Sequence, residues 1–476
     1  MDPRFKTFLM VLAALLLAPL LGWKIAEGEL LWPALAVAVA GAVTLTRFTR
    51  TSGDVVFLGV VLVGYIVGNR GFAQLQVLGN LPLLPAEAVL LVAGAWRFTL
   101  CAFERRLPVK ADWLNRLVLL WLIVGSVRVL FDLPEHRILA LRDYAMVYYA
   151  AFFFLAQHMA QDEGSRRFLI RSLITASVLL LPIGPAYEAF PEAFWSALNV
   201  GGAPLVYFKG DLLNTFLGIA ALLVFVATPG ARRMWVLPVT AAIFAYVLFG
   251  TNRASALALL TASGLFAAAR RWQFPAWHLG AAGLAGLVAI GAAILTDNDW
   301  AQEKIRGAAD RIVSLVDPGG SRTYRSEESG NKGDNNRFRL IWWRSVARET
   351  MSENPAFGLG FGYDLAGGFV REYSPEIAEE FSTRSPHNLF VTALGRMGLT
   401  GLLLWAGIFT LIVTRTWTAL RGDDEIDATL WSAATMILIS STFGVVLEGP
   451  MGALPFWVIV GVAAARSELP ATETTR

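Results

Sequence analysis

Long stretches without a charged side chain constrain this chain more than any other feature of its sequence. Residues 212–231, 234–252, 272–296 and 428–447 contain no Asp, Glu, Lys or Arg. Each stretch is close to the roughly 20 residues that an α-helix needs to cross a bilayer. The mean hydropathy of +0.54 and the 55% of hydrophobic residues extend this pattern to the whole chain. The sequence therefore predicts an all-α, polytopic integral membrane protein.

Further apolar runs bring the predicted number of transmembrane helices to about 14, within a range of about 12 to 14. The predicted spans are 6–23, 30–46, 55–69, 83–100, 113–131, 143–160, 168–189, 211–229, 234–250, 254–270, 276–296, 387–414, 428–446 and 451–466. The first run follows two basic residues, as a signal peptide would. Because so many spans come after it, we expect an uncleaved first helix.

Basic residues are concentrated in alternate connections between these spans, which predicts their orientation. The basic connections contain Arg47 and Arg50; Arg97, Arg105, Arg106 and Lys110; Arg166 and Arg167; Arg232 and Arg233; Arg270 and Arg271; and Arg415 and Arg421. The positive-inside rule places these connections and both termini in the cytoplasm. The other connections then face the outer side of the membrane. The predicted division is 1–296 with helices 1–11, 297–386 as a periplasmic loop domain, 387–466 with helices 12–14, and a cytoplasmic tail at 467–476.

The long loop at 297–386 has internal structure of its own. Its apolar periodicity predicts amphipathic helices at 300–316 and 337–351, the second stopped by Asn354-Pro355. The Gly-, Ser- and charge-rich residues 317–336 between them are expected to be flexible. Glycines at 358, 360 and 362 resemble part of a nucleotide-binding loop. We reject a nucleotide site here, because no strand precedes these glycines and nucleotides are scarce outside the cytoplasm.

Composition excludes several classes of function. The net charge is only +3 and the basic residues lie in loops, so nucleic acid is not an expected partner. A single cysteine, Cys101, rules out an internal disulfide framework and a cysteine metal cluster. Four scattered histidines do not predict a zinc site, and we expect no metal.

His387 is the best-placed candidate for acid–base chemistry. It lies in Ser385-Pro386-His387-Asn388, where the long loop meets the next predicted span. We expect Ser385 to cap that helix and Pro386 to occupy its first turn. The positive end of the helix dipole favours a neutral imidazole, which is the form that a general base needs. One alternative is a histidine that only forms hydrogen bonds at the membrane interface. The base could also be an outer carboxylate such as Asp364 or Glu448, or the reaction could proceed without a base.

Several cations are predicted at the same membrane face. Arg253 stands in a tight turn between two apolar spans, and Lys209 begins the span before that turn. Arg337, Arg339 and Arg344 lie on the second loop helix. A guanidinium can hold a phosphate through two parallel hydrogen bonds, whereas a snorkelling interfacial arginine is the alternative interpretation.

Three pieces of the sequence, within about 205–415, resemble the O-antigen ligase and O-antigen polymerase superfamily of bacterial envelope glycosyltransferases. The turn at 251–255 (Thr-Asn-Arg-Ala-Ser) is similar to the family's Thr/Ser-x-Arg turn. The stretch from 337 to 362, with Asn-Pro and Gly-Leu-Gly-Phe-Gly, resembles its loop helix and glycine stretch. His387-Asn388-Leu389 with Gly395, Gly398 and Gly401 looks like its HN-x-x-L…G-x-x-G helix. Many relatives carry an arginine where this chain has Lys209, and residues 1–200 match no family motif.

The resemblance implies a metal-independent enzyme without a cofactor. Its donor would be an undecaprenyl-diphosphate-linked oligosaccharide, and its acceptor a growing glycan or lipid A-core. Membrane lipids and a chain-length regulator are further expected partners. Arg253, Lys209, Arg337, Arg339 and Arg344 would bind the donor diphosphate, with Arg253 and His387 as the catalytic pair.

The expected number of spans favours a polymerase of O-antigen or exopolysaccharide repeats over a ligase that attaches the glycan to lipid A-core. A transporter or flippase of lipid-linked glycans is the alternative from another class. Glu87 and Arg97, inside the predicted span 83–100, are the residues that would favour it.

Overall fold

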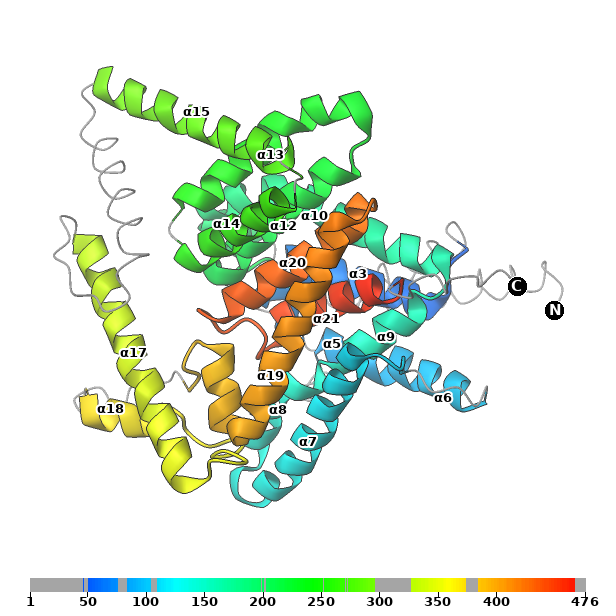
Figure 1. Cartoon of the computed structure of the whole chain (residues 1–476), viewed down its shortest axis with the longest axis vertical. Helices are drawn as coiled ribbons and strands as arrows, with labels where there is room; N and C mark the ends of the chain where they lie inside the picture. The colour runs from blue at the N-terminus through cyan, green and yellow to red at the C-terminus, as the bar shows by residue number, and fades with distance from the viewer. Residues whose placement is uncertain are drawn as a thin grey trace, which may run out of the picture.

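The computed structural model describes residues 46, 50–75, 84–103, 109–197, 199–200, 203–250, 252–269, 271, 273–295, 327–373 and 384–466. Within these residues the fold is helical except for one short antiparallel pair of strands, β1 (Asn199–Val200) and β2 (Ala203–Pro204). The prediction of an all-α architecture is therefore confirmed for the described part of the chain (Figure 1).

The helices follow the predicted spans closely. In chain order they are α3 (Gly53–Val67), α4 (Arg70–Ala73), α5 (Pro85–Val89), the π-helix η1 (Leu90–Gly94), α6 (Ala95–Phe103), α7 (Trp113–His136), α8 (Ile138–Tyr148), α9 (Ala151–Met159), α10 (Glu163–Ala189), α11 (Pro191–Ala197), α12 (Gly210–Ala227), the 3-10 helix η2 (Gly230–Arg232), α13 (Arg233–Phe249), α14 (Arg253–Ala268), α15 (Gln273–Leu295), α17 (Glu327–Glu353), α18 (Gly367–Tyr373), α19 (Leu389–Arg421), α20 (Glu425–Ser441) and α21 (Pro450–Ala464). The predicted spans 6–23 and 30–46 lie outside the described residues, residue 46 excepted.

Six of the described helical segments are long and apolar enough to cross a membrane. They are Pro85–Phe103, Trp113–His136, Ile138–Met159, Glu163–Ala189, Gly230–Phe249 and Leu389–Arg421. Five shorter apolar helices accompany them, at Gly53–Val67, Leu212–Ala227, Arg253–Ala268, Ala276–Val288 and Pro450–Ala464. These segments agree with a multi-pass membrane protein, while the total of 14 spans stays a prediction.

The centre of the bundle is built around α21, whose residues are almost all buried. Three tryptophans stack in a chain across the helices around it. The ring of Trp405 on α19 lies 5.5 Å from Trp121 on α7 and 5.8 Å from Trp457 on α21, centroid to centroid. One pair is edge-on and the other tilted, and these large rings in contact fix the spacing of the three helices.

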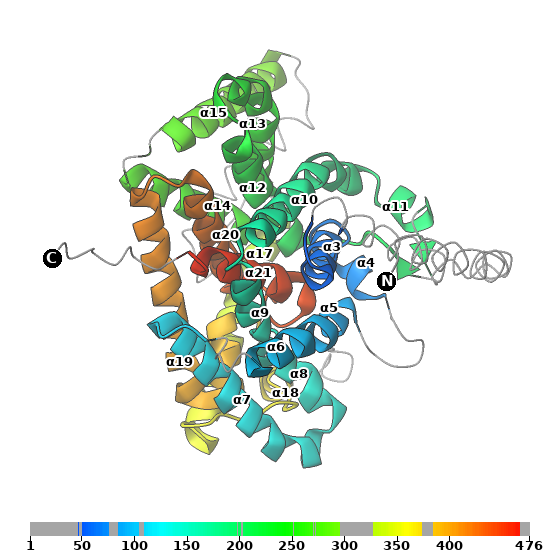
Figure 2. The same ribbon diagram turned by 90° about the vertical axis from the view of Figure 1, so that its right-hand side faces the viewer.

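A second group of helices packs to one side of α12. Figure 2 shows α12, α13 and α15 close together at one end of the molecule. A buried hydrogen bond joins two of them, because Thr240 Oγ1 lies 3.0 Å from His278 Nε2. His278 is thereby accounted for as a core residue between two phenylalanine rings.

The described part of the long loop packs as a small unit with its own core. α17 contacts α19 near one end, and α18 lies against α17 (Figure 1). Trp342 and Val346 of α17 share this core with Leu365, Phe369 and Val370, all of them buried. The amphipathic helix predicted at 337–351 is present, but α17 begins ten residues earlier, at Glu327. Residues 327–336 are thus helical where we expected a flexible stretch, and the helix predicted at 300–316 lies outside the described residues.

Candidate functional site

The ends of several helices meet at the loop 442–449, which joins α20 to α21 and which we call the central loop. Lys209, the residue before α12, donates a hydrogen bond from Nζ to the carbonyl oxygen of Val445. Thr392, in the first turn of α19, donates to Glu448 Oε1 over 3.1 Å. Residues separated by more than 200 positions in the sequence therefore converge on one short loop.

A buried cluster of hydroxyl groups fixes the helices below this loop. Thr215 Oγ1 of α12 lies 2.9 Å from Ser255 Oγ of α14 and 2.9 Å from Ser440 Oγ of α20. All three side chains are fully buried. Because buried hydroxyl groups are costly without partners, this cluster sets the mutual position of the three helix ends. It places the start of α14, where Arg253 lies, beside the start of α12 and the end of α20.

Four helices begin around the central loop: α12, α14, α19 and α21. Asn252 caps α14 by accepting from the Ser255 N–H, and α21 begins directly after Gly449. The first N–H groups of a helix have no partner within the helix and carry a partial positive charge. Several such ends at one place form an environment that favours an anion.

The predicted cations divide into two groups. Lys209 and Arg339 reach the central loop, Arg339 by a 2.9 Å hydrogen bond from Nη1 to the carbonyl oxygen of Phe443. Arg253 is the first residue of α14 and is partly buried. Arg337 and Arg344 are exposed on α17. The structure thus brings Lys209, Arg253 and Arg339 to one region, and leaves Arg337 and Arg344 on an outer face of the loop helix.

His387 adopts an unusual backbone conformation just before α19. Its φ of 57° lies in the left-handed region, which a residue with a side chain rarely occupies. Its neighbours hold this conformation: the Trp343 indole donates to the Pro386 carbonyl oxygen over 2.6 Å, and the Trp342 ring centre lies 6.2 Å from the imidazole. Strained backbone that is held so firmly is often found at functional sites.

The predicted capping of this helix was wrong. Asn388, not Ser385, is the N-cap of α19, and its Oδ1 accepts from the N–H groups of Phe390 and Val391. Pro386 consequently lies outside the helix, because the left-handed His387 turns the chain before the first helical residue. Ser385 instead donates a 2.7 Å hydrogen bond to Glu448 Oε1. This bond ties the residues before His387 to the central loop.

Glu448 is the carboxylate of this region. Burial raises its pKa, while hydrogen bonds from Ser385 and Thr392 and the charges of Arg396 and Lys209 act in the opposite direction. Its Oε1 accepts from two different segments, the residues before His387 and the first turn of α19. Glu448 therefore holds the central loop against the start of α19.

The glycine stretch 358–362 packs into a break in α19. Gly358, Gly360 and Gly362 have φ values of 74°, 100° and 88°, which explains why glycine is needed at each of them. Gly398 interrupts α19 with a φ of 64°. The loop satisfies the backbone groups freed by this break, because Leu399 N–H donates to Pro355 O and Leu359 N–H to Gly395 O. The glycines of α19 thus allow the glycine stretch to pack directly against the backbone of this helix.

A buried arginine fixes the same loop from the other side. Arg396 of α19 is only 3% exposed and forms a 2.8 Å ion pair with Asp143 of α8. It also donates to the carbonyl oxygens of Gly360 and Tyr363. Asp132 of α7 accepts from the Phe361 N–H over 2.7 Å. These contacts hold the glycine stretch 358–362 against the α7–α8 hairpin.

Part of this site lies in residues that match a known protein family. Residues 238–406 match the model of the family described as O-Antigen ligase. Within these residues the chain is similar to that family. This match confirms the resemblance to the ligase and polymerase superfamily that the sequence motifs indicated. No curated protein matches the chain.

The O-antigen ligase match contains Arg253, the loop arginines, His387 and the broken helix at Gly398. Lys209 precedes the matched residues and the central loop follows them. The fold brings both segments to the matched region. Sequence reasoning did not identify the hydroxyl cluster or Arg396. An arginine inside the apolar span 387–414 was a usable signal, because a charge at that depth needs a partner.

Proposed function

We propose that this protein is a glycosyltransferase that moves a glycan from undecaprenyl diphosphate to a sugar acceptor at the periplasmic face of the inner membrane. In this proposal it polymerises the repeat units of O-antigen or of an exopolysaccharide. The observation that carries it is the convergence of four helix N-termini, Lys209, Arg253 and Arg339 around the central loop. A diphosphate leaving group needs concentrated positive charge in this form.

The transfer itself requires a base and a stabilised leaving group. The acceptor hydroxyl oxygen forms a bond to the anomeric carbon while the bond from that carbon to the diphosphate oxygen breaks. The electron pair of the broken bond leaves with the lipid diphosphate, whose negative charge is stabilised by Arg253, Lys209 and Arg339. The proton of the acceptor hydroxyl passes to the imidazole of His387. The rigid surroundings of His387 support this role because they pre-orient its ring.

A ligase that attaches the finished glycan to lipid A-core is the second candidate. The description of the matched family favours it, whereas the expected number of spans favours the polymerase. The donor chemistry is the same in both, so the acceptor decides between them.

The charged residues that would favour a transporter have structural partners. Arg97 of α6 pairs with Asp54 and donates to Ser52, and both of these partners lie at the start of α3. Glu87 accepts hydrogen bonds from Tyr148 and Tyr149. Contacts of this kind support a role in packing and do not mark a substrate path.

The deciding experiment is the profile of lipid-linked glycans in cells from which the protein is deleted. A polymerase deletion accumulates single lipid-linked repeats, and a ligase deletion accumulates long lipid-linked chains. Wild-type protein and the His387→Ala variant, expressed at equal levels, are the matched complements. If single repeats stayed on the cytoplasmic side of the membrane in the deletion strain, the protein would be a flippase and the proposal would be wrong.

A further inference from the structure

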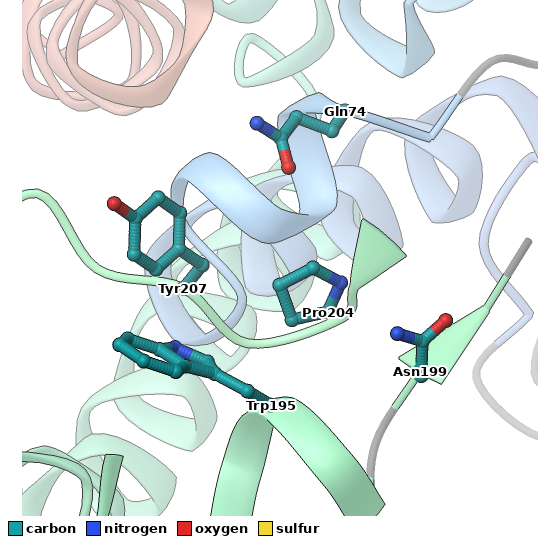
Figure 3. Close-up of a pocket in the computed structure, with 5 residues that line it drawn as sticks. All are labelled: Gln74, Trp195, Asn199, Pro204 and Tyr207. Carbon is teal, nitrogen blue, oxygen red and sulfur yellow. The ribbon is translucent and has the colours of Figure 1, made fainter. Parts of the chain in front are cut away.

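A hollow with a volume of about 380 Å³ lies apart from the central loop, where α4, α11 and the β1–β2 hairpin meet. Gln74, Trp195, Asn199, Pro204 and Tyr207 line it (Figure 3). Its volume falls within the range of about 300–1,000 Å³ typical of small-molecule sites. Figure 3 shows the amide of Gln74 and the ring of Trp195 on opposite sides of Pro204, with Tyr207 next to the indole.

The indole of Trp195 is held in a fixed orientation although 43% of the residue is exposed. Its Nε1 donates a 3.4 Å hydrogen bond to the hydroxyl of Tyr187, which is itself buried against Phe208. The ring of Tyr207 lies edge-on to the Trp195 indole, with the ring centroids 6.1 Å apart. An exposed aromatic face with a fixed direction is a ready platform for a flat apolar surface.

The hydrogen-bonding groups around this platform are neutral. Gln74 and Asn199 are both exposed, and each amide offers a carbonyl acceptor and an NH₂ donor. The described residues that line the hollow contain no Asp, Glu, Lys or Arg. A sugar ring has one face of C–H groups and a rim of hydroxyl groups, so it matches an indole face flanked by amides.

The hollow is connected to the central loop by a short piece of backbone. Tyr207 pairs with Asn69, and the Asn69 side chain accepts from the backbone N–H of Lys209 over 3.2 Å. Tyr207 and Lys209 are two residues apart, which is about 7 Å of extended chain. The side chain of Lys209 then reaches Val445 in the central loop. The hollow therefore lies close enough to the central loop for a glycan whose diphosphate is bound there to reach it.

We infer that the hollow around Trp195 is a glycan subsite, which binds a sugar ring of the saccharide chain at a distance from the bond being formed. The C–H face of the sugar packs on the Trp195 indole, and its hydroxyl groups bond to Gln74 and Asn199. This inference rests on the proposed function for the source of the sugar, which is the chain of the donor or of the acceptor. A role in anchoring the protein to the lipid interface is the competing explanation for exposed Trp and Tyr.

Two features of the hollow favour a sugar over lipid. An interfacial anchor needs no cavity, whereas Trp195 forms the wall of a hollow that also contains two amide side chains. The indole N–H is already bonded to Tyr187, so it is not directed towards lipid headgroups. The guanidinium of Arg70 lies 5.4 Å from the Tyr207 ring centre and braces that wall.

The test is direct binding to the full-length protein in lipid nanodiscs. The probe is the water-soluble repeat oligosaccharide released by mild acid from the lipid-linked pool of cells that lack the protein. We expect Trp195→Ala to weaken the dissociation constant for this probe by about tenfold and Trp195→Phe by less, since phenylalanine keeps an aromatic face. Trp235→Ala is the matched control, because Trp235 is 84% exposed and lies on α13.

Transfer assays on the same variants identify the source of the sugar. A higher KM for the donor alone, with kcat unchanged, assigns the hollow to the donor chain, and a higher KM for the acceptor alone assigns it to the acceptor. Equal binding by wild type and Trp195→Ala would overturn the subsite even if transfer proceeds. Lower thermal stability in nanodiscs without any change in probe binding would also overturn it, in favour of a lipid anchor. Binding that depends on Trp195 in a protein without transferase activity would retain the subsite and refute the proposed function.

Discussion

The two ends of α20 are held by different kinds of contact. At its start, Arg166 pairs with Asp427, Arg233 with Glu425, and Arg466 with Asp424. At its end, the surrounding elements are joined through hydroxyl groups, backbone carbonyl oxygens and the buried carboxyl group of Glu448.

The two ends differ in whether their cations are paired with carboxylates or bonded to backbone carbonyl oxygens. An ion pair between side chains neutralises both partners, so the start of α20 is a structural junction. A carbonyl oxygen orients a cation such as Lys209 or Arg339 without cancelling its charge. The positive helix ends around the central loop add to that charge. The comparison therefore supports the proposal that anions bind at one end of the bundle, while the other end serves to dock helices.

The largest effect is expected from His387. We predict that His387→Ala and His387→Gln lower kcat for glycan transfer by about 10² to 10⁴-fold, the usual contribution of a general base. Glutamine can form hydrogen bonds but cannot accept a proton at neutral pH. In the wild type, activity should fall as the solution is acidified and the imidazole becomes protonated, and this acid limb should be absent from the residual activity of His387→Gln. An unchanged pH–rate profile in the mutant would remove His387 from the chemistry.

The next effect concerns the cations. Arg253→Ala should lose on the order of 2–4 kcal/mol of transition-state stabilisation, as expected when one group that stabilises developing negative charge is removed. Arg253→Lys should recover part of it, because lysine keeps the charge without the bidentate fork. Arg344→Ala is the matched control, since Arg344 is exposed on α17 away from the central loop. Equal kcat/KM for the two alanine variants would place the donor site elsewhere.

The helices could be predicted from the sequence because each has a local signal, and the candidate site residues were proposed from signals of the same kind. Charge-free runs of bilayer length predict the spans, and Arg253 and His387 stand at the ends of such runs. The position of Arg339 beside Phe443 could not be predicted, because it depends on how α17 packs against distant helices. The same holds for the N-cap of α19: Ser385 and Asn388 are both good N-cap residues, and the left-handed His387 makes Asn388 the cap.

The first turns of α17 also differ from what local sequence predicts. Residues 327–336 are rich in glycine and charge, so local propensity argues against a helix there. The helix nevertheless extends through them, ahead of Trp342 and Val346, which are anchored in the loop core. Tertiary packing at one end can carry a helix into a stretch that would not form it alone.

Glu448 tests whether the central loop tolerates the loss of its carboxylate charge. Glu448→Gln keeps an oxygen that can accept from Ser385 and Thr392. Burial raises the pKa of Glu448, so the folded state disfavours the charged form and the carboxyl group costs stability as the pH rises. We predict that the glutamine variant is at least as stable as the wild type at neutral pH. This difference in Tm should shrink as the pH falls below the raised pKa, and it should disappear once the pH is below the ordinary pKa of a glutamate in the unfolded chain. A glutamine variant without activity and with a normal Tm would instead make Glu448 the base.

The smallest effect is expected at the opposite end of α20. Arg466 pairs with Asp424 and lies 3.9 Å from Glu163, and all three side chains are between 41% and 50% exposed. Exposed ion pairs contribute about 0.2–1 kcal/mol and are screened by salt. Arg466→Ala should therefore lower the Tm slightly at low ionic strength and not at all at high ionic strength, as measured by thermal unfolding in detergent. Its kcat and its KM for the lipid-linked donor should equal those of the wild type, in contrast to Arg253→Ala. A change in donor KM as large as that of Arg253→Ala would contradict the division of roles between the two ends, because it would show that anion binding depends on charge at both.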